Sequence, residues 1–276
     1  MAECLFMSRS DALLSMFDAS GQGLEIGPSF NPLLPKSGGY RVDILDHLTA
    51  DGLRDKYRNA GVDISRIEEV DYVSDGGSIA ELIGKRGHYD YCVALHVIEH
   101  SVDLIGFLKD CECLLKPEGV LVLAVPDKRF GFDILRPCSS TGDVLRAHLQ
   151  GAKVHDIGKI FDEMAYNCLR GGHAAWPPGA PGDLAFFRSL PAAQQAYERF
   201  ASTHEFVDIH AWQFTPSSFR LIAHDLAELG MTMLRERGFI APGSGEFYVT
   251  LSKQAAGYSG DRLRLAQEAL MELAVT

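Results

Sequence analysis

The residues with the clearest chemical potential are two histidines and a carboxylate in the segment Leu95–His100, which follows an apolar run. Histidine titrates near neutral pH, so His100 is a candidate general base, with a hydrogen-bonded structural histidine as the alternative. His96 and His100 are four residues apart, and on a helical turn this spacing could also ligate a metal ion. Because no third ligand can be identified in the sequence, we expect no metal site.

Acidic residues follow two earlier apolar runs. Glu25 and Gly27 close the first run, and Gly27 permits a tight turn that would bring backbone amides against a ligand, although such turns also occur without one. Asp46, about twenty residues later, is placed to hold a ribose diol. Asp43 competes for that role. A helix cap before the helical stretch 48–60 is the alternative explanation of Asp46.

Polar residues follow the third and fifth apolar runs as well. Asp75, which precedes Gly76, could accept a hydrogen bond from an adenine amino group, but a plain turn also accounts for it. Asp127 and Lys128 are candidates for positioning a substrate, with a solvated turn as the alternative.

Residues 204–214 mix aromatic side chains with histidine and aspartate. Aromatic faces cover the apolar faces of sugars while polar groups bind hydroxyls, so this composition suits a sugar or another polar acceptor. His210 and Trp212 are the acceptor-site candidates. Packing of a cap against the rest of the protein is the alternative.

Five short apolar runs must position these residues, and a helical spacing at 102–115 separates the last two runs. Strand, helix and strand in this order predict right-handed parallel crossovers and a sheet covered on both faces, with ligands bound beyond the carboxyl ends of the strands. We therefore expect an α/β fold with a doubly wound, mostly parallel sheet. The five runs are GLEIG, YRVDILD, EEVDYV, YDYCVAL and GVLVLAVP.

The pattern changes after Pro126, where most histidines and both tryptophans occur. We expect a core at 1–129, a helical or irregular cap at 130–220 and completion of the core at 221–276. Within the last two parts we expect a helix at 217–230, a strand at 232–237, the strand EFYVTLSK antiparallel to the fifth strand, and a surface helix at 260–275.

These features together resemble the class I S-adenosylmethionine-dependent methyltransferases of the broad type 11 group. The resemblance covers roughly residues 20–127 and the later EFYVTL, and its most specific pieces are HVIEH and LLKPEGVLVLAVP. It implies S-adenosylmethionine as cofactor, with the first-strand residues near its methionine part, the second-strand acid on ribose, the third-strand acid near adenine, and the segment after the fourth strand at the methyl site. The cofactor contacts expected on this basis are Glu25, Gly27, Pro28, Asp46, His47, Asp75, Gly76 and His96, and the expected catalytic residues are His100, Asp127, Lys128 and His210.

The first loop departs from the family pattern. That family usually places two or three glycines here, whereas this chain reads Gly27-Pro28-Ser29-Phe30-Asn31-Pro32. Proline fixes its backbone and has no amide donor, so the loop cannot cradle a cofactor in the usual way. The missing GxGxxG pattern also argues against a nicotinamide-dependent dehydrogenase.

Charge and composition narrow the classes of partner. Lys and Arg number 26 against 37 Asp and Glu, for a formal net charge of −11. An acidic surface repels phosphate backbones and anionic lipids, so we expect neither a nucleic-acid nor a membrane partner. The six cysteines lack paired metal-site spacing and suggest reduced thiols in a cytoplasmic protein.

The sequence therefore predicts methyl transfer to a small molecule or a glycan-type acceptor. The alternative is a non-catalytic protein of the same fold that acts as a scaffold or as a partner of another enzyme. The loop at Pro28 favours the alternative, and the acids together with HVIEH favour the enzyme.

Overall fold

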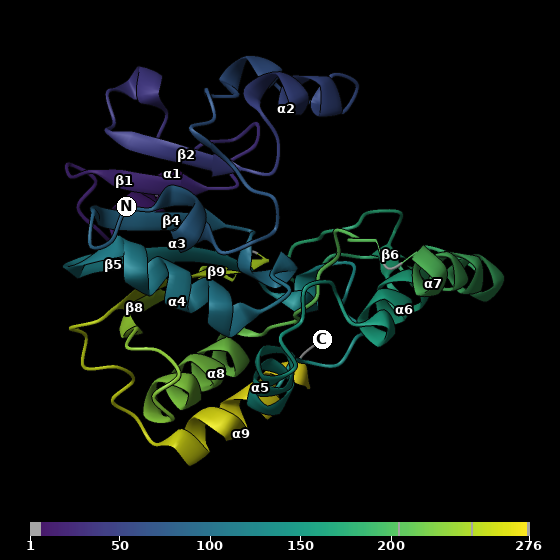
Figure 1. Ribbon diagram of the computed structural model, residues 1–276. Helices are drawn as coiled ribbons and strands as arrows, with labels where there is room; N and C mark the ends of the chain where they lie inside the picture. The colour runs from purple at the N-terminus through teal and green to yellow at the C-terminus, as the bar shows by residue number, and fades with distance from the viewer. Residues whose placement is uncertain (1–6, 204, 244, 275–276) are drawn as a thin grey trace, which may run out of the picture.

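A seven-stranded sheet forms the centre of the computed structural model, which describes residues 7–203, 205–243 and 245–274 (Figure 1). In spatial order its strands are β3 (Tyr72–Val73), β2 (Val42–Asp46), β1 (Gly23–Ile26), β4 (Tyr89–Leu95), β5 (Leu115–Pro126), β9 (Glu246–Ser252) and β8 (Arg235–Ile240).

The first five strands are parallel, and β9 pairs antiparallel with both β5 and β8. This confirms the predicted doubly wound sheet and the antiparallel pairing of EFYVTLSK. Two details differ from the sequence prediction: β3 is only two residues long, and β8 begins at Arg235 rather than at residue 232.

Helices cover both faces of the sheet. Residues that alternate along β4 show the division, because Cys92 and Ala94 pack into one apolar cluster, whereas Tyr91 and Val93 pack into another on the opposite face. The first cluster includes residues of α3, α4, α5 and α8, and the second includes residues of α1. The helices are α1 (Arg9–Leu14), α2 (Ala50–Tyr57), α3 (Ile79–Ile83), α4 (Leu104–Leu114), α5 (Thr141–Leu149), α6 (Ile157–Tyr166), α7 (Leu190–Thr203), α8 (Pro216–Glu228) and α9 (Arg262–Leu273).

The C-terminal helix α9 packs against α8 (Figure 1). Arg262 pairs with Asp225 of α8 at 2.6 Å. Glu272 accepts a hydrogen bond from the amide of Ser217, one of the donors that the first turn of α8 cannot satisfy itself. The sequence prediction placed this helix at 260–275; its described part ends at Leu273, and residue 275 lies outside the described residues.

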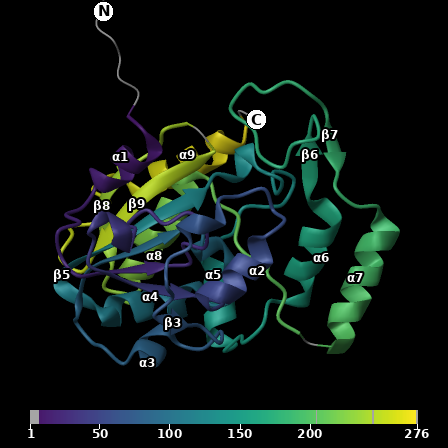
Figure 2. The same cartoon turned by 90° about the horizontal axis from the view of Figure 1, so that it is seen from above.

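A side lobe, residues 157–203, stands beside the sheet and contains α6, α7 and the hairpin of β6 (Cys168–Arg170) and β7 (Leu184–Phe186) (Figure 2). The predicted cap began earlier in the chain, at residue 130. Helix α5 falls in that predicted range, but it packs against α4 and α8, which cover the sheet, whereas α6 packs against α7.

After the side lobe, the chain returns to the sheet through residues 205–214, which we call the return segment. The amide of Lys128 donates to the carbonyl of Phe214, and the amide of Ala211 donates to the carbonyl of Glu99. The return segment therefore lies against the ends of β4 and β5. In the part of the chain described here, no helix is long and apolar enough to cross a membrane.

Candidate active site

The carboxyl ends of β1 and β4 lie side by side where the strand order reverses, which is where doubly wound sheets bind ligands. Gly27 follows β1 with a φ of +65°. A Cβ at Gly27 would lie 3.0 Å from Cγ2 of Val97, which follows β4. Glycine at position 27 thus lets the loops after β1 and β4 approach each other closely, because a side chain there would press against Val97.

Two buried carboxylates fold the loop that follows Gly27. Glu25 accepts hydrogen bonds from the amides of Leu33, at 2.7 Å, and Leu34, at 3.1 Å. Asp46 accepts one from the amide of Ser29 at 2.9 Å. These bonds hold a loop that lacks the usual glycines, and Ser29 adopts a φ of +49°, which is unusual for a residue with a side chain.

Burial raises the pKa of Glu25 to about 7, against the two backbone hydrogen bonds that lower it. The neighbouring residues Leu24 and Ile26 pack into the first apolar cluster, so Glu25 faces the opposite side of β1. Its carboxylate is 1% exposed and therefore acts on the loop rather than on a ligand in this conformation.

The two acids of β2 have different environments. Asp46, at the end of the strand, is 1% exposed and also accepts from the amide and Nδ1 of His47, at 2.7 and 2.6 Å. The side chain of His47 is about half exposed and contacts Lys56 through Nε2. Asp43 instead binds Lys85 and the hydroxyl of Tyr89. Of the two acids, only Asp46 lies at the carboxyl end of β2, next to His47.

Asp46 is not a helix cap, because Thr49 accepts the hydrogen bond from Gly52 at the start of α2. Asp75 is exposed and accepts from the amide of Gly77, as in an ordinary turn of this kind. Gly76 has a φ of +86°, and a Cβ there would meet no described atom within 4 Å. The third loop therefore offers an open surface with one carboxylate.

His96 is the first residue after β4 and has a φ of +56°. Its Nε2 lies 2.8 Å from Oε2 of Glu246, and Arg9 pairs with the other oxygen of Glu246 at 2.6 Å. Burial lowers the pKa of His96, but its hydrogen bond with Glu246 and the nearby negative charge of Glu99 raise that pKa to about 9. His96 is thereby committed to a network at the end of β9 and does not pair with His100.

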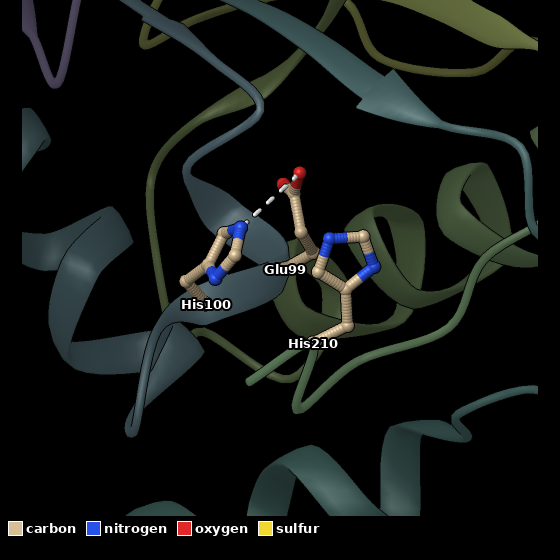
Figure 3. Close-up of side chains that lie close together, drawn as sticks. All are labelled: Glu99, His100 and His210. Atoms are coloured by element: carbon tan, nitrogen blue, oxygen red, sulfur yellow. Dashed lines mark ion pairs between the residues drawn. The ribbon is translucent and has the colours of Figure 1, made fainter. Parts of the chain in front are cut away.

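His100 instead lies beside His210 of the return segment, with ring centroids 4.7 Å apart and planes at 90°. Glu99 completes the group, and one ligand atom from each of the three residues lies within 4.8 Å of the others. Figure 3 shows a nitrogen of each imidazole ring turned toward the carboxylate of Glu99. We call these three residues the histidine–glutamate cluster.

Two further carboxylates hold the outer nitrogens of this cluster. Nδ1 of His100 lies 2.8 Å from Asp208, and Nδ1 of His210 lies 3.1 Å from Asp133. Burial lowers the pKa of His100, but the hydrogen bond with Asp208 outweighs this effect and raises that pKa above its ordinary value. Both imidazole rings are therefore oriented with Nε2 available on the inner side.

Asp127 and Lys128 do not form the solvated turn that the sequence left open. Both are 4% exposed. Asp127 binds Arg129, with Nε at 2.9 Å from Oδ1, and Lys128 donates to the carbonyl of Ile134. Burial lowers the pKa of Lys128. These contacts join the end of β5 to the chain that follows it.

The prediction that Trp212 offers a stacking face to an acceptor is wrong for this structure. Its side chain is fully buried in the main core, and its Nε1 donates to the carbonyl of Ser101 at 2.6 Å. Nζ of Lys159 lies 3.0 Å from the ring centroid and covers one face. Trp212 therefore anchors the return segment, and of the two candidates only His210 reaches the cluster.

Sequence reasoning missed the roles of Asp133, Asp208 and Glu246. Asp133 and Asp208 are 77 and 108 residues from the histidines that they bind, and Glu246 is 150 residues from His96. Glu99 was recognised only as part of the segment HVIEH. No local spacing marks pairs so far apart, because the folding of the return segment and of β9 creates them.

Comparison with known proteins finds a family match over residues 9–180, which is more than half of the chain; the family is described as a methyltransferase domain. The ubiquinone biosynthesis O-methyltransferase of Rhodopseudomonas palustris (strain TIE-1) is 36% identical over 52 residues, 19% of this chain and 21% of the relative. The enzyme of the same name from Bradyrhizobium diazoefficiens is 38% identical over 50 residues, 18% and 20% of the two chains. The match thus spans about a fifth of the length of these curated relatives.

Among solved structures, a SAM-dependent methyltransferase from Aquifex aeolicus is 12% identical, covers 89% of both chains and has a TM-score of 0.45. The assignment of the fold depends on the strand order described above.

Proposed function

This chain belongs to the methyltransferase-domain family, and from that premise we propose that it transfers a methyl group from S-adenosylmethionine to a hydroxyl group of a small molecule or glycan. The observation that carries the proposal is the position of the histidine–glutamate cluster, which follows β4 at the same edge of the sheet as Gly27.

The residues at this edge fit an adenosyl cofactor. Gly27 lets backbone approach closely between the loops after β1 and β4, and His47 and Asp75 present polar side chains at the ends of the next two strands. We assign the cofactor contacts to Gly27, His47 and Asp75, with Asp46 behind His47. Glu25 and Pro28 shape the loop. When bound, S-adenosylmethionine supplies an electrophilic methyl group on a sulfonium centre.

The protein's own residues must align the acceptor and take up its proton. In methyl transfer, a lone pair of the acceptor oxygen forms the new C–O bond, the old C–S bond breaks with its electrons left on sulfur, and the hydroxyl proton leaves. Nε2 of His100 can accept that proton, because Nδ1 is held by Asp208. His210, whose ring centroid lies 4.7 Å from that of His100, orients the same hydroxyl.

A hydroxyl acceptor is further supported by the names of the two curated relatives, which are O-methyltransferases. The return segment would then determine which acceptor is bound, since it supplies Asp208 and His210 beside His100.

Calorimetric titration with S-adenosylmethionine and with its demethylated product tests the first half of the proposal, and formation of that product with a panel of hydroxylated acceptors tests the second. Micromolar binding of either ligand is the expected result. Absence of heat and of thermal stabilisation with both ligands would contradict the proposal.

A second candidate function is that of a non-catalytic scaffold with the same fold. One observation favours it: the amides of Ser29, Leu33 and Leu34 already bind carboxylates of the protein, so the loop after β1 cannot offer these donors to a cofactor. The same titration separates the two candidates.

A further inference from the structure

We infer that the histidine–glutamate cluster binds a divalent metal ion of the zinc class, through Nε2 of His100, Nε2 of His210 and a carboxylate oxygen of Glu99. The inference deepens the proposed function by giving the ion a place beside the acceptor hydroxyl, but the binding of the ion is independent of methyl transfer and can be measured by itself.

The first argument is the ligand set. Zinc accepts histidine nitrogen and carboxylate oxygen at about 2.0–2.2 Å, so two ligand atoms of one ion lie at most about 4 Å apart. Nε2 of His100 is 3.9 Å from Oε1 of Glu99, and all three ligand atoms lie within 4.8 Å of one another. Side-chain shifts of under about 1 Å bring them onto one ion.

The second argument is the state of Glu99. Its side chain is 0% exposed, and among the residues that the structure describes neither carboxylate oxygen has a hydrogen-bond partner. Its Oε1 lies 3.4 Å from Nδ1 of His96 and 3.9 Å from Nε2 of His100. A buried carboxylate without hydrogen bonds is costly, and a divalent cation between the carboxylate and the two imidazoles removes that cost.

The third argument is the arrangement of the outer carboxylates. Histidines that bind metals usually donate the other ring N–H to a carboxylate, which fixes the tautomer and the ring orientation. Here Asp208 holds Nδ1 of His100, and Asp133 holds Nδ1 of His210. Both rings are thus held with Nε2 toward Glu99, as the close-up in Figure 3 shows.

Three protein ligands leave a fourth position open, as in catalytic rather than structural zinc sites. A hydroxyl group bound there becomes more acidic, because the ion stabilises the alkoxide. The ion would then replace His100 as the group that activates the acceptor, and the proton would pass to solvent. Removal of the ion with a chelator distinguishes the two routes. It abolishes activation of the hydroxyl by the ion and leaves proton transfer to His100 intact.

The test uses the full-length protein stripped with a chelator and then loaded with Co²⁺, whose visible absorption reports coordination by nitrogen and oxygen ligands, or with Zn²⁺ in equilibrium dialysis. We expect one ion per chain. His210→Ala should weaken binding by more than about 100-fold, and Asp208→Asn, which removes an outer carboxylate that is 63% exposed, by about 10- to 100-fold.

His173→Ala is the matched control, because His173 is exposed and lies outside the cluster. It should bind Co²⁺ as tightly as the wild type does. Circular dichroism of each variant tests for loss of the fold, and Asp208→Asn keeps the test valid if His210→Ala does not fold. Equal binding by the wild type, His210→Ala and Asp208→Asn, or an absorption spectrum of hexaaquo Co²⁺ only, would overturn the metal site.

Titration of the stripped protein with S-adenosylmethionine separates this inference from the proposed function. Co²⁺ binding at the cluster without cofactor binding would overturn the proposed function and support the metal site. If the protein bound the cofactor and all variants bound Co²⁺ equally, the metal site would be overturned and the proposed function supported.

Discussion

The carboxylate of Asp46 accepts a hydrogen bond from the backbone amide of Ser29 at 2.9 Å, which ties the end of β2 to the loop after β1. The other oxygen of Asp46 binds His47, so both oxygens have protein donors. Asp46 therefore supports the expected cofactor site through the loop and through His47.

We predict that Asp46→Ala weakens binding of S-adenosylmethionine by about 1.5–3 kcal/mol, because His47 and the loop after β1 lose the charged acceptor that positions them. The variant should also lose about 1–3 kcal/mol of folding stability, because the amide of Ser29 loses its partner. Calorimetry measures the first effect and urea unfolding the second. Asp43→Ala is the control on the same strand; a larger loss of cofactor affinity in Asp43→Ala than in Asp46→Ala would show that the wrong acid was chosen.

We predict that Glu25 makes the ligand-free protein less stable as pH rises from about 4.5 to about 7. The pKa of Glu25 is raised to about 7 from 4.5 by burial, so the folded state binds the proton more tightly than the unfolded state. The contribution is complete below pH 4.5 and lost above pH 7. At about 1.4 kcal/mol per pKa unit, the change is on the order of 3 kcal/mol.

Urea unfolding at pH 4.5 and pH 8 tests this prediction when wild type is compared with Glu25→Gln, which cannot ionise. The stability difference between the two proteins should shift in favour of the variant at pH 8. Glu81→Gln, at an exposed glutamate of α3, should keep the pH dependence of the wild type. A constant difference between wild type and Glu25→Gln across the two pH values would show that Glu25 ionises normally.

We predict that Trp212→Ala destabilises the fold by about 3–5 kcal/mol, the usual cost of removing a fully buried tryptophan. The variant also leaves the carbonyl of Ser101 without its indole donor. Trp212→Phe keeps most of the apolar volume and should lose only about 1–2 kcal/mol, chiefly the hydrogen bond. If thermal unfolding showed Trp212→Ala within about 1 kcal/mol of wild type, the return segment would not depend on this anchor.

The parallel strands could be predicted from the sequence because each is a short apolar run followed by polar residues or glycine, and the spacing of α4 set the crossover between β4 and β5. The extent of the cap could not be predicted. In Thr141–Leu149 one residue, Val144, is fully buried and Leu145 and Ala147 are partly buried, and nothing local shows that α5 packs on the core rather than on the side lobe.

Only the part of the candidate site that directly follows the strands of the sheet could be predicted from the sequence. His100 could be singled out because it follows an apolar strand, but its partner Asp208 and its neighbour His210 come from a segment more than a hundred residues later. Trp212 shows the limit of composition, since an aromatic residue beside histidine and aspartate suits a sugar site and an anchor equally well. Burial, which decided between them, is a property of the folded chain.

The last prediction separates the cofactor side of the site from the acceptor side. His210→Ala should leave the affinity for S-adenosylmethionine within about twofold, because His210 contacts His100 and Asp133 rather than the loops at Gly27 and His47. Methyl transfer should fall by about 100-fold or more, since loss of an acceptor-orienting or acid–base group typically costs 10²–10⁴-fold in rate. Calorimetry gives the affinity, and formation of the demethylated cofactor with a fixed hydroxylated acceptor gives the rate.

His173→Ala should change neither quantity. Asp46→Ala should show the opposite pattern, with weaker cofactor binding and a smaller change in turnover at saturating cofactor. If His210→Ala lowered cofactor affinity as much as Asp46→Ala does, the histidine–glutamate cluster would belong to the cofactor site, and the acceptor would have to bind elsewhere.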